Sequence, residues 1–431
     1  MKIVKSTPIS SFGGLNFVLK ELLSLKIDQL LSHYLPSLPN QSTFSWKDIL
    51  FSYWSIFFCG GDCAEDIGYN LKYIFKNNPL IKSPSPDRLL SRLKDLSEPT
   101  LHLKKNRSES INDISINSNL NRLNVSIIKR LKTLRKKNVV LDYDNTLIYT
   151  KKSDAKKSYK KEYGYSPAVG IIGNNIVYIE NRNGNCAPHT MQDDTIDRMF
   201  EVLKSQGITV DSFRADSASY MFSTITTINK HVKLLYVKTR MNANISEAIR
   251  NITNWREINI DGKILQRGSI IFTPFLRTAK REKKTELLKE YRLIVTKEQR
   301  RDGQMNLFTG DACVYSPILT NDFDKTEDEI VEFYNRRGDR EREFDILKND
   351  FAWQKLPFSK LEQNTVYLII TAICRNIYNY LIHKFSHICK GLSPNFRLKK
   401  FIFRFICIPA KWIYTGRTYK LRYYGDIGFK V

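Results

Sequence analysis

The stretch VVLDYDNTLI, residues 139–148, decides how we expect this chain to fold. It is an apolar run that ends in Asp142 and Asp144, and it has the pattern of a buried strand. PAVGII (167–172), a turn at GNN, and IVYIE (176–180) predict two further strands joined by a hairpin. We therefore expect a sheet that begins as a meander. Both aspartates should lie on one face of its first strand, because side chains two residues apart share a face.

The segments after this meander alternate between helices and strands. Residues 193–206 and 245–253 have helical periodicity, whereas TVDSFRAD (209–216) and LLYVKTR (234–240) have the pattern of strands. Strands that first pair through hairpins and then alternate with helices predict an α/β fold, with a mixed sheet flanked by helices.

Aspartates end two of the predicted strands. Asp142 and Asp144 close the first, and Asp216 closes the strand at 209–216. Carboxylates at neighbouring strand ends provide hard oxygen ligands, which suit Mg²⁺ or Mn²⁺. The alternative is that each aspartate caps the turn or helix that follows it.

A third acidic residue, Glu341, lies in a helical segment that begins near Lys325. Tyr334, Arg337 and Lys348 are spaced so that, with Glu341, they fall within an arc of about 60° on one helix face. A phenol, a guanidinium, a carboxylate and an ammonium would then form one stripe. The alternative is an exposed helix face covered with salt bridges.

Residues 1–135 have mainly helical patterns. In the segment PDRLLSRLK, Pro86 suits the first helical position, and the helix should present Arg88 and Arg92 outward. Short helices that end in a basic one resemble a helix-turn-helix DNA-binding arrangement, and a solvated face is the alternative. The Asn- and Ser-rich residues 106–119 predict a linker.

The later part of the chain changes character twice. QMNLF (304–308) and its flanking segments have strand patterns, and a helical pattern returns near Lys325. Basic and aromatic residues are mixed at the C-terminus, which suits a nucleic-acid surface or a basic strand packed on the domain. We predict five parts: a helical DNA-binding domain with its linker (1–135), the first part of an α/β core (136–254), a β-rich insertion (255–320), the second part of the core with the Glu341 helix (321–390), and a basic aromatic tail (391–431).

The charge and composition limit the partners. The chain has 69 lysines and arginines against 44 acids, a formal charge of +25, which favours a polyanion such as nucleic acid. A hydrophobic content of 42% excludes a disordered chain. The apolar runs are shorter than the roughly 18 residues of a membrane span. The N-terminus lacks the pattern of a secretory signal, so we expect a cytoplasmic protein without a membrane partner.

The cysteines and histidines form no convincing metal site in the sequence. Seven cysteines, an odd number, predict reduced thiols. Cys59 with Cys63, and His383 with His387 and Cys389, lack a second ligand pair at zinc-site spacing. We leave both groups out of the predicted sites.

Several stretches together resemble a known family. The pattern Y-x2-R-x3-E-x6-K, from Tyr334 to Lys348, is similar to the hallmark of bacterial insertion-sequence transposases of the DDE type. LDYDNT resembles the first-aspartate motif of that group, FRADSASY the second, and GIIGNNIVYIENRNGN the hairpin between them. ISSFGGL resembles its leading domain, so the likeness covers most of residues 8–385. Asn145 stands where the group usually has Ser.

The resemblance implies an RNase H-like catalytic core with a β-rich insertion. It implies that Asp144, Asp216 and Glu341 hold Mg²⁺ or Mn²⁺, as two ions, with Asp142 as a further ligand or a substitute for Asp144. The activity would be metal-dependent cleavage at transposon ends and strand transfer into target DNA. The partner would be double-stranded DNA, both terminal inverted repeats and target, bound by a dimer in a synaptic complex in the bacterial nucleoid.

The resemblance also suggests DNA contacts. Three side chains would contact phosphates near the cut end: Tyr334, Arg337 and Lys348. An aromatic residue of the insertion would stack on a flipped base, and Trp255 is the candidate by position, with Phe272 and Phe275 as rivals. A Trp packed in the core is the alternative for Trp255.

Two other functions fit parts of the sequence. VVLDYDNTLI also matches the D-x-D-x-T-L motif of haloacid-dehalogenase-like phosphatases, in which Asp142 would be the nucleophile and Asp144 the acid/base. The charge of +25 and the missing downstream Lys and paired-acid motif count against it. The second alternative is a transposase-derived DNA-binding protein in which the carboxylates are idle.

Overall fold

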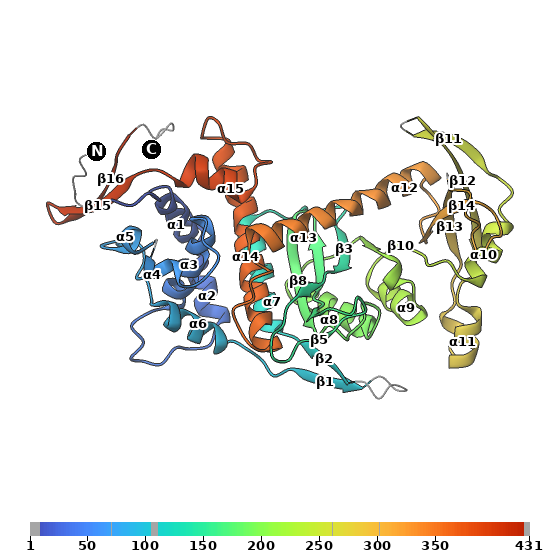
Figure 1. Ribbon diagram of the computed structural model, residues 1–431, viewed down its shortest axis with the longest axis horizontal. Helices are drawn as coiled ribbons and strands as arrows, with labels where there is room; N and C mark the ends of the chain where they lie inside the picture. Colours follow the sequence, from blue (N-terminus) through green and yellow to red (C-terminus); the bar gives the residue numbers. More distant parts are fainter. Residues whose placement is uncertain (1–8, 70, 105–110, 261, 301, 426–431) are drawn as a thin grey trace.

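A large mixed sheet runs along the long axis of the protein (Figure 1). The computed structural model describes residues 9–69, 71–104, 111–260, 262–300 and 302–425. The sheet has 11 strands in the order β1-β2-β8-β7-β3-β9-β10-β14-β13-β12-β11. Strands of both directions occur in it, and helices pack on it, so the predicted α/β class with a mixed sheet is confirmed.

The centre of the sheet holds the strands that carry the predicted aspartates. Its five strands are β3 (Val140–Asn145), β7 (Ala168–Ile172), β8 (Asn175–Arg182), β9 (Ser212–Ala215) and β10 (Leu234–Lys238). The predicted meander is present, because β7 pairs antiparallel with both β3 and β8. β9 lies parallel to both β3 and β10. A small sheet, β4 (Ile148–Tyr149), β6 (Tyr163–Tyr165) and β5 (Lys156–Lys157), lies in the connection from β3 to β7.

Different helices cover the two faces of the central strands. α8 (Gln192–Ser205) and α9 (Phe222–His231) share a core with Leu141 and Tyr143 of β3. The opposite side chains of β7 pack in the core of α14 (Leu361–Ser386). By length and composition α14 is apolar enough to cross a membrane, but 89% of its most apolar window is buried inside the protein. It packs as a core helix.

The predicted β-rich insertion extends the same sheet. Its strands are β11 (Arg256–Ile260), β12 (Lys263–Phe272), β13 (Tyr291–Gln299) and β14 (Cys313–Thr320). β14 joins it to the central strands by pairing antiparallel with β10, and its strands lie at one end of the molecule (Figure 1). α10 (Ala243–Arg250) precedes β11, and α11 (Leu276–Glu282) follows β12. The predicted strand at 304–308 is wrong: the chain turns back on itself there, with Asn306 N donating to Asp311 O.

The N-terminal helices pack against α14. They are α1 (Leu15–Ser24), α2 (Ile27–Tyr34), α3 (Trp46–Phe58), α4 (Asp66–Tyr69), α5 (Lys72–Phe75) and α6 (Pro86–Lys94). Pro86 occupies the first turn of α6, as predicted, and Ser85 caps it. Trp54 Nε1 donates to Ile370 O at 3.0 Å, deep in a core that α3 and α14 share. The N-terminal helices therefore have no core separate from α14 among the described residues, and the five-part division remains a prediction.

The predicted linker at 106–119 is wrong where the structure describes it. β1 (Leu101–Lys104) and β2 (Ile111–Ser115) are paired strands, and β2 joins the main sheet beside β8. α7 (Ser118–Leu131) begins immediately afterwards, capped by Asn117. The asparagines misled the prediction because they can serve as partners of buried backbone: Asn117 caps α7, and its amide donates to Leu96 O at 2.8 Å.

The predicted helix from Lys325 is interrupted. α12 (Glu327–Asn335) ends, a 3₁₀ turn spans Arg336–Gly338, and α13 (Asp339–Asp350) follows. Tyr334 and Glu341 therefore lie on different helices rather than on the one unbroken helix that the spacing predicted. The tighter 3₁₀ turn changes the angle between successive side chains.

The C-terminal segment folds against the N-terminus. α15 (Leu398–Phe401) leads into a π-helical turn (Ile402–Ile406) and then into the hairpin of β15 (Ala410–Thr415) and β16 (Thr418–Tyr423). Gly14 N donates to Ile406 O, and a Cβ at Gly14 would lie 2.0 Å from Phe405 O. The hairpin and α1 lie together at one end of the molecule (Figure 1).

Candidate active site

Asp144 and Asp216 lie side by side at the carboxyl edge of the sheet. β3 and β9 are parallel, and Tyr143 pairs with Ala215. The next residue in each chain segment is one of the two aspartates, so their side chains leave the sheet on the same face. The strand register thus brings together two acids that are 72 residues apart in the sequence.

Each aspartate already has partners in the protein. Asp144 Oδ2 is 2.9 Å from Arg337 Nη2, and its Oδ1 accepts from Asn145 N at 2.9 Å. Asp216 accepts from Ala218 N at 3.0 Å and caps the 3₁₀ turn that follows β9. The capping alternative is therefore correct for Asp216, but a carboxylate oxygen that caps a turn retains further lone pairs for another ligand.

The electrostatic environment of Asp144 connects it with the other predicted acids. Burial, and after it the nearby charges of Asp216 and Glu341, raise the pKa of Asp144 to about 6, although the charge of Arg337 lowers it. Glu341 itself is exposed on α13. The charges of Asp216 and Glu341 thus both disfavour the charged form of Asp144, which favours a cation beside it.

Tyr334 and Lys348 lie differently from what the predicted stripe implies. The Tyr334 hydroxyl donates to Ala215 O at 3.2 Å, and burial raises its pKa to about 12. Tyr334 therefore holds α12 against β9. Lys348 is half-buried further along α13, where burial and the charge of Lys160 lower its pKa. Arg337 is the member of the predicted trio that forms an ion pair with the acids, while Tyr334 lies near enough for the charges of Asp216 and Asp144 to raise its pKa.

Asp142 belongs to a buried ion pair. Arg214 Nε and Nη2 contact its two oxygens at 2.7 and 2.9 Å, and Arg340 Nε lies 3.5 Å from Oδ2. The Asp142 side chain is only 2% exposed. Because both oxygens already face guanidinium groups, the environment favours Asp144 over Asp142 as the first acid of the site.

Sequence reasoning missed Arg214 and Arg340. Arg214 stands two residues before Asp216, on the same strand face, and pairs across the strands with Asp142. An alignment of the two predicted strands in this register could have identified Arg214 as the partner of Asp142. Arg340 belongs to α13 and stands 126 residues after Arg214 in the chain. The sequence near Arg340 has no local signal for its contact with Asp142.

The predicted aromatic residues of the insertion pack against the main core. Trp255 is partly buried against the core, with Lys297 Nζ 5.6 Å from its ring centre and Gly268 beneath the ring. This arrangement fits the packed-Trp alternative. The Phe275 ring packs 4.7 Å from that of Tyr220, and Phe272 packs on the same core.

Arg88 and Arg92 lie on α6, among the N-terminal helices. Both line a small hollow of about 230 Å³. Arg92 pairs with Asp95 at 2.9 Å, and Arg88 is exposed. Neither arginine contacts the three acids among the described residues, so a DNA contact of α6 would be separate from the acid site.

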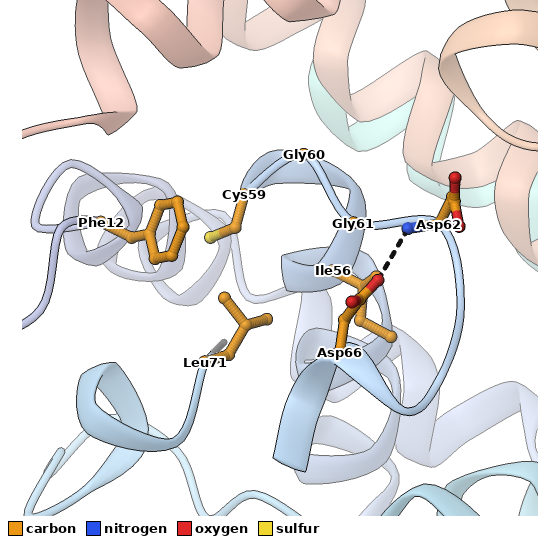
Figure 2. A pocket seen from close by; sticks show the side chains of 8 residues that line it. All are labelled: Phe12, Ile56, Cys59, Gly60, Gly61, Asp62, Asp66 and Leu71. Carbon is orange, nitrogen blue, oxygen red and sulfur yellow. Dashed lines mark hydrogen bonds between the residues drawn. The ribbon is translucent and has the colours of Figure 1, made fainter. Parts of the chain in front are cut away.

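Cys59 and Cys63, which we left out of the predicted sites, lie at a small pocket at the end of α3 and in the turn beside it (Figure 2). Cys59 points into it, and Asp66 Oδ2 accepts from Asp62 N at 3.0 Å and from Cys63 N at 3.3 Å. Ligand atoms of Asp62, Cys63 and Asp66 lie within 4.8 Å of one another. The Asp66 carboxylate serves the turn before α4, so these contacts have a structural explanation.

Of the comparisons with known proteins, a family model agrees with the DDE transposase part of the resemblance. No curated protein matches the chain. Seven chains of solved structures do. One is a cryo-EM structure of a piggyBac transposase synaptic complex with hairpin DNA, 12% identical, with a TM-score of 0.43, covering 90% of this chain and 78% of that one. The model of the family described as transposase DDE domain group 1 matches residues 5–424, so this chain belongs to that family of DDE transposases.

Proposed function

We propose that this DDE transposase cleaves DNA at transposon ends and joins those ends to target DNA, with Asp144, Asp216 and Glu341 as its metal-binding residues. The observation that carries the proposal is the register of β3 and β9, which places Asp144 beside Asp216. The charge of Glu341 acts on the same carboxyl group. Acids on rigid strand ends, together with one from a helix, provide a fixed set of ligands.

The residues fit a divalent metal ion. Carboxylate oxygens are the ligands that Mg²⁺ and Mn²⁺ prefer. A cation among these acids would offset the repulsion that contributes to the raised pKa of Asp144. Two such ions, when bound, activate a water or a 3′-hydroxyl and stabilise the leaving oxygen in phosphoryl transfer. The role of the protein in this chemistry would be to present the three carboxylates at one edge of the sheet.

Arg337 is the residue suited to bind the phosphate. In the protein it neutralises part of the charge of Asp144 across 2.9 Å. A guanidinium binds phosphate through two parallel hydrogen bonds. Because a metal ion would take over the Asp144 charge, Arg337 would become available to the phosphate beside it.

The architecture supports the finer parts of the proposal. The order β8-β7-β3-β9-β10, antiparallel in its first three strands and parallel in its last three, is the arrangement we expect of an RNase H-like core. The insertion and the Y-x2-R-x3-E-x6-K residues point to the bacterial insertion-sequence group, although Lys348 lies further along α13, near Lys160. We include in the proposal double-stranded DNA as partner, a dimer that synapses two ends, and a place in the cytoplasm with the nucleoid.

Cleavage of the natural DNA ends tests the proposal. The substrate is a duplex that carries the inverted repeats flanking the gene in its genome, incubated with the protein and Mg²⁺ or Mn²⁺. Asp216→Asn and Glu341→Gln should abolish cleavage and retain DNA binding. Glu332→Gln, which removes an exposed carboxylate paired with Arg336, is the control and should cleave normally. Normal cleavage by Asp216→Asn and Glu341→Gln would remove the triad from the proposal.

The phosphatase alternative has no support in the site. Its nucleophile would be Asp142, whose oxygens are bound by Arg214 in the core. Release of phosphate from p-nitrophenyl phosphate, lost in Asp142→Asn, would reinstate it. An idle DNA-binding protein would bind the same duplex with equal affinity in all variants and cleave it in none, including the unmodified chain.

A further inference from the structure

A strongly basic cavity lies next to the acid site. It has a volume of about 760 Å³. Its walls come from the end of α7 and the loop after it, the start of β3, the turn between β7 and β8, the junction of α12 and α13, and the end of α14. Six of its lining residues are lysines or arginines, and two are histidines: Lys132, Arg135, Arg214, Arg336, Arg340, Lys384, His383 and His387.

The acids near this cavity leave part of its positive charge uncompensated. Asp142 is the single carboxylate among the residues that line it, and Arg214 already binds Asp142. Lys384 pairs with Glu21 at 2.6 Å and Arg336 with Glu332 at 2.7 Å. Arg340 also lies 3.5 Å from Asp142. The remaining four, Lys132, Arg135, His383 and His387, are exposed and have no ion pair among the described residues.

The cavity continues along the sheet into the acid site. Asp142 and Arg214 line it, and Asp144 and Asp216 follow each of them by two residues on the same strand face. Two residues of a strand span about 7 Å. One strand of DNA carries a phosphate for about every 3.4 Å of helix axis. A backbone that enters the cavity would therefore reach the acids within a few phosphates.

We propose that this cavity binds the phosphate backbone of the DNA that enters the acid site. The inference rests on the proposed function for the identity of the polyanion. The charge favours it because cations from separate segments face one space, as a phosphate chain requires and a single small anion does not. The segment from Arg336 to Arg340 connects the two sites, since Arg337 reaches Asp144 and Arg340 lines the cavity.

The test replaces two exposed cations of the α7 loop. The double variant Lys132→Gln/Arg135→Gln is compared with Lys230→Gln/Lys233→Gln, which removes the same charge from exposed residues of α9 and the loop after it, outside the cavity lining. The probe is a fluorescent DNA duplex of mixed sequence, titrated at several salt concentrations. Each lost phosphate contact reduces the slope of log affinity against log salt by about 0.9, or about eightfold in affinity at 0.1 M salt.

The double variant Lys132→Gln/Arg135→Gln, called here the cavity pair, should differ from the control in the following way. Its salt slope should fall by about 2, and its affinity at 0.1 M salt by at least about tenfold, while the Lys230/Lys233 pair keeps the slope of the unmodified chain. Equal slopes for both pairs would overturn the inference. So would calorimetry in which the cavity pair loses the binding of inorganic pyrophosphate but keeps that of the duplex.

Failure of the inference and failure of the proposed function are separable. The DNA titration needs no metal and no cleavage, so it can be repeated with Asp216→Asn. A weakened cavity pair in a protein that never cleaves would support the inference and contradict the proposed chemistry. Normal cleavage with unchanged DNA binding in the cavity pair would contradict the inference alone.

Discussion

Arg337 and Asp144 form an ion pair, 2.9 Å from Nη2 to Oδ2, in which the arginine opposes three influences that disfavour the charge of the carboxylate. Those influences are burial, Asp216 and Glu341, and together they prevail, since the pKa of Asp144 rises to about 6. The pair connects the strand β3 to the turn between α12 and α13. It makes the acid site sensitive to pH and to cations.

Without metal, the charged form of Asp144 should destabilise the protein. Its pKa rises from the ordinary 3.8 to about 6, so the folded protein holds more protons than the unfolded chain between these values. The contribution of Asp144 to stability is therefore present below about pH 4 and lost as the pH rises through 6, by up to about 3 kcal/mol. Urea denaturation in chelator should show this loss in the unmodified chain relative to Asp144→Asn.

Asp345→Asn provides the control for that experiment. Asp345 is exposed on α13 and pairs with Arg397 at the surface, so its removal should leave the pH dependence nearly unchanged. If Asp144→Asn retains the full pH dependence of the unmodified chain, the raised pKa belongs to another group.

Mn²⁺ should stabilise the folded protein through the same acids. An ion at about 100 times its dissociation constant adds about 2.7 kcal/mol to the unfolding free energy, or several degrees in the melting temperature. Asp144→Asn and Asp216→Asn should lose most of that shift. At pH 5 the apparent affinity for Mn²⁺ should be about tenfold lower, because protons compete for a carboxyl group with a pKa of about 6. The shift in melting temperature at a given Mn²⁺ concentration should then be smaller. If both variants show the same Mn²⁺ shift at pH 8 as the unmodified chain, the ion binds elsewhere.

Asp142 should behave as a structural residue. It is buried with Arg214, and breaking a buried ion pair by removing one partner costs about 3 to 5 kcal/mol. Asp142→Asn should lower the urea midpoint accordingly and keep its melting shift with Mn²⁺. Arg92→Ala, which breaks the more exposed pair with Asp95, should cost less than about 1 kcal/mol. A stable Asp142→Asn protein without the Mn²⁺ response would identify Asp142 as a metal ligand.

The sequence predicted the central strands because their signals are local. Apolar runs, hairpin turns and terminal aspartates are visible within a few residues, and they placed Asp144 and Asp216 at strand ends. The neighbouring positions of β3 and β9, and hence the contact of these acids, depend on a register between distant segments. Only the structure supplies that register.

The errors arose where polar residues have tertiary roles. Asn117 lies in the segment predicted as a linker, yet it caps α7 and its amide donates to Leu96 O inside the protein. The helical wheel through Tyr334 and Lys348 assumed one straight helix, and the 3₁₀ turn at Arg336–Gly338 broke it. Arg340 bonds to Gly173 O and approaches Asp142 only because α13 packs there.

Substitution of Tyr334 tests whether this residue contacts a phosphate or has a structural role. Its hydroxyl donates to Ala215 O at 3.2 Å and its ring is buried, so it holds α12 on the strand that precedes Asp216. Tyr334→Phe should lower the unfolding free energy by about 1 kcal/mol, because one buried carbonyl loses its partner. DNA affinity and its salt dependence should stay unchanged, whereas Arg337→Gln should weaken binding of a duplex in the presence of Mn²⁺. Fluorescence titration of both variants measures this difference. A loss of DNA affinity in Tyr334→Phe equal to that in Arg337→Gln would mean that the hydroxyl leaves Ala215 to contact a phosphate when DNA binds.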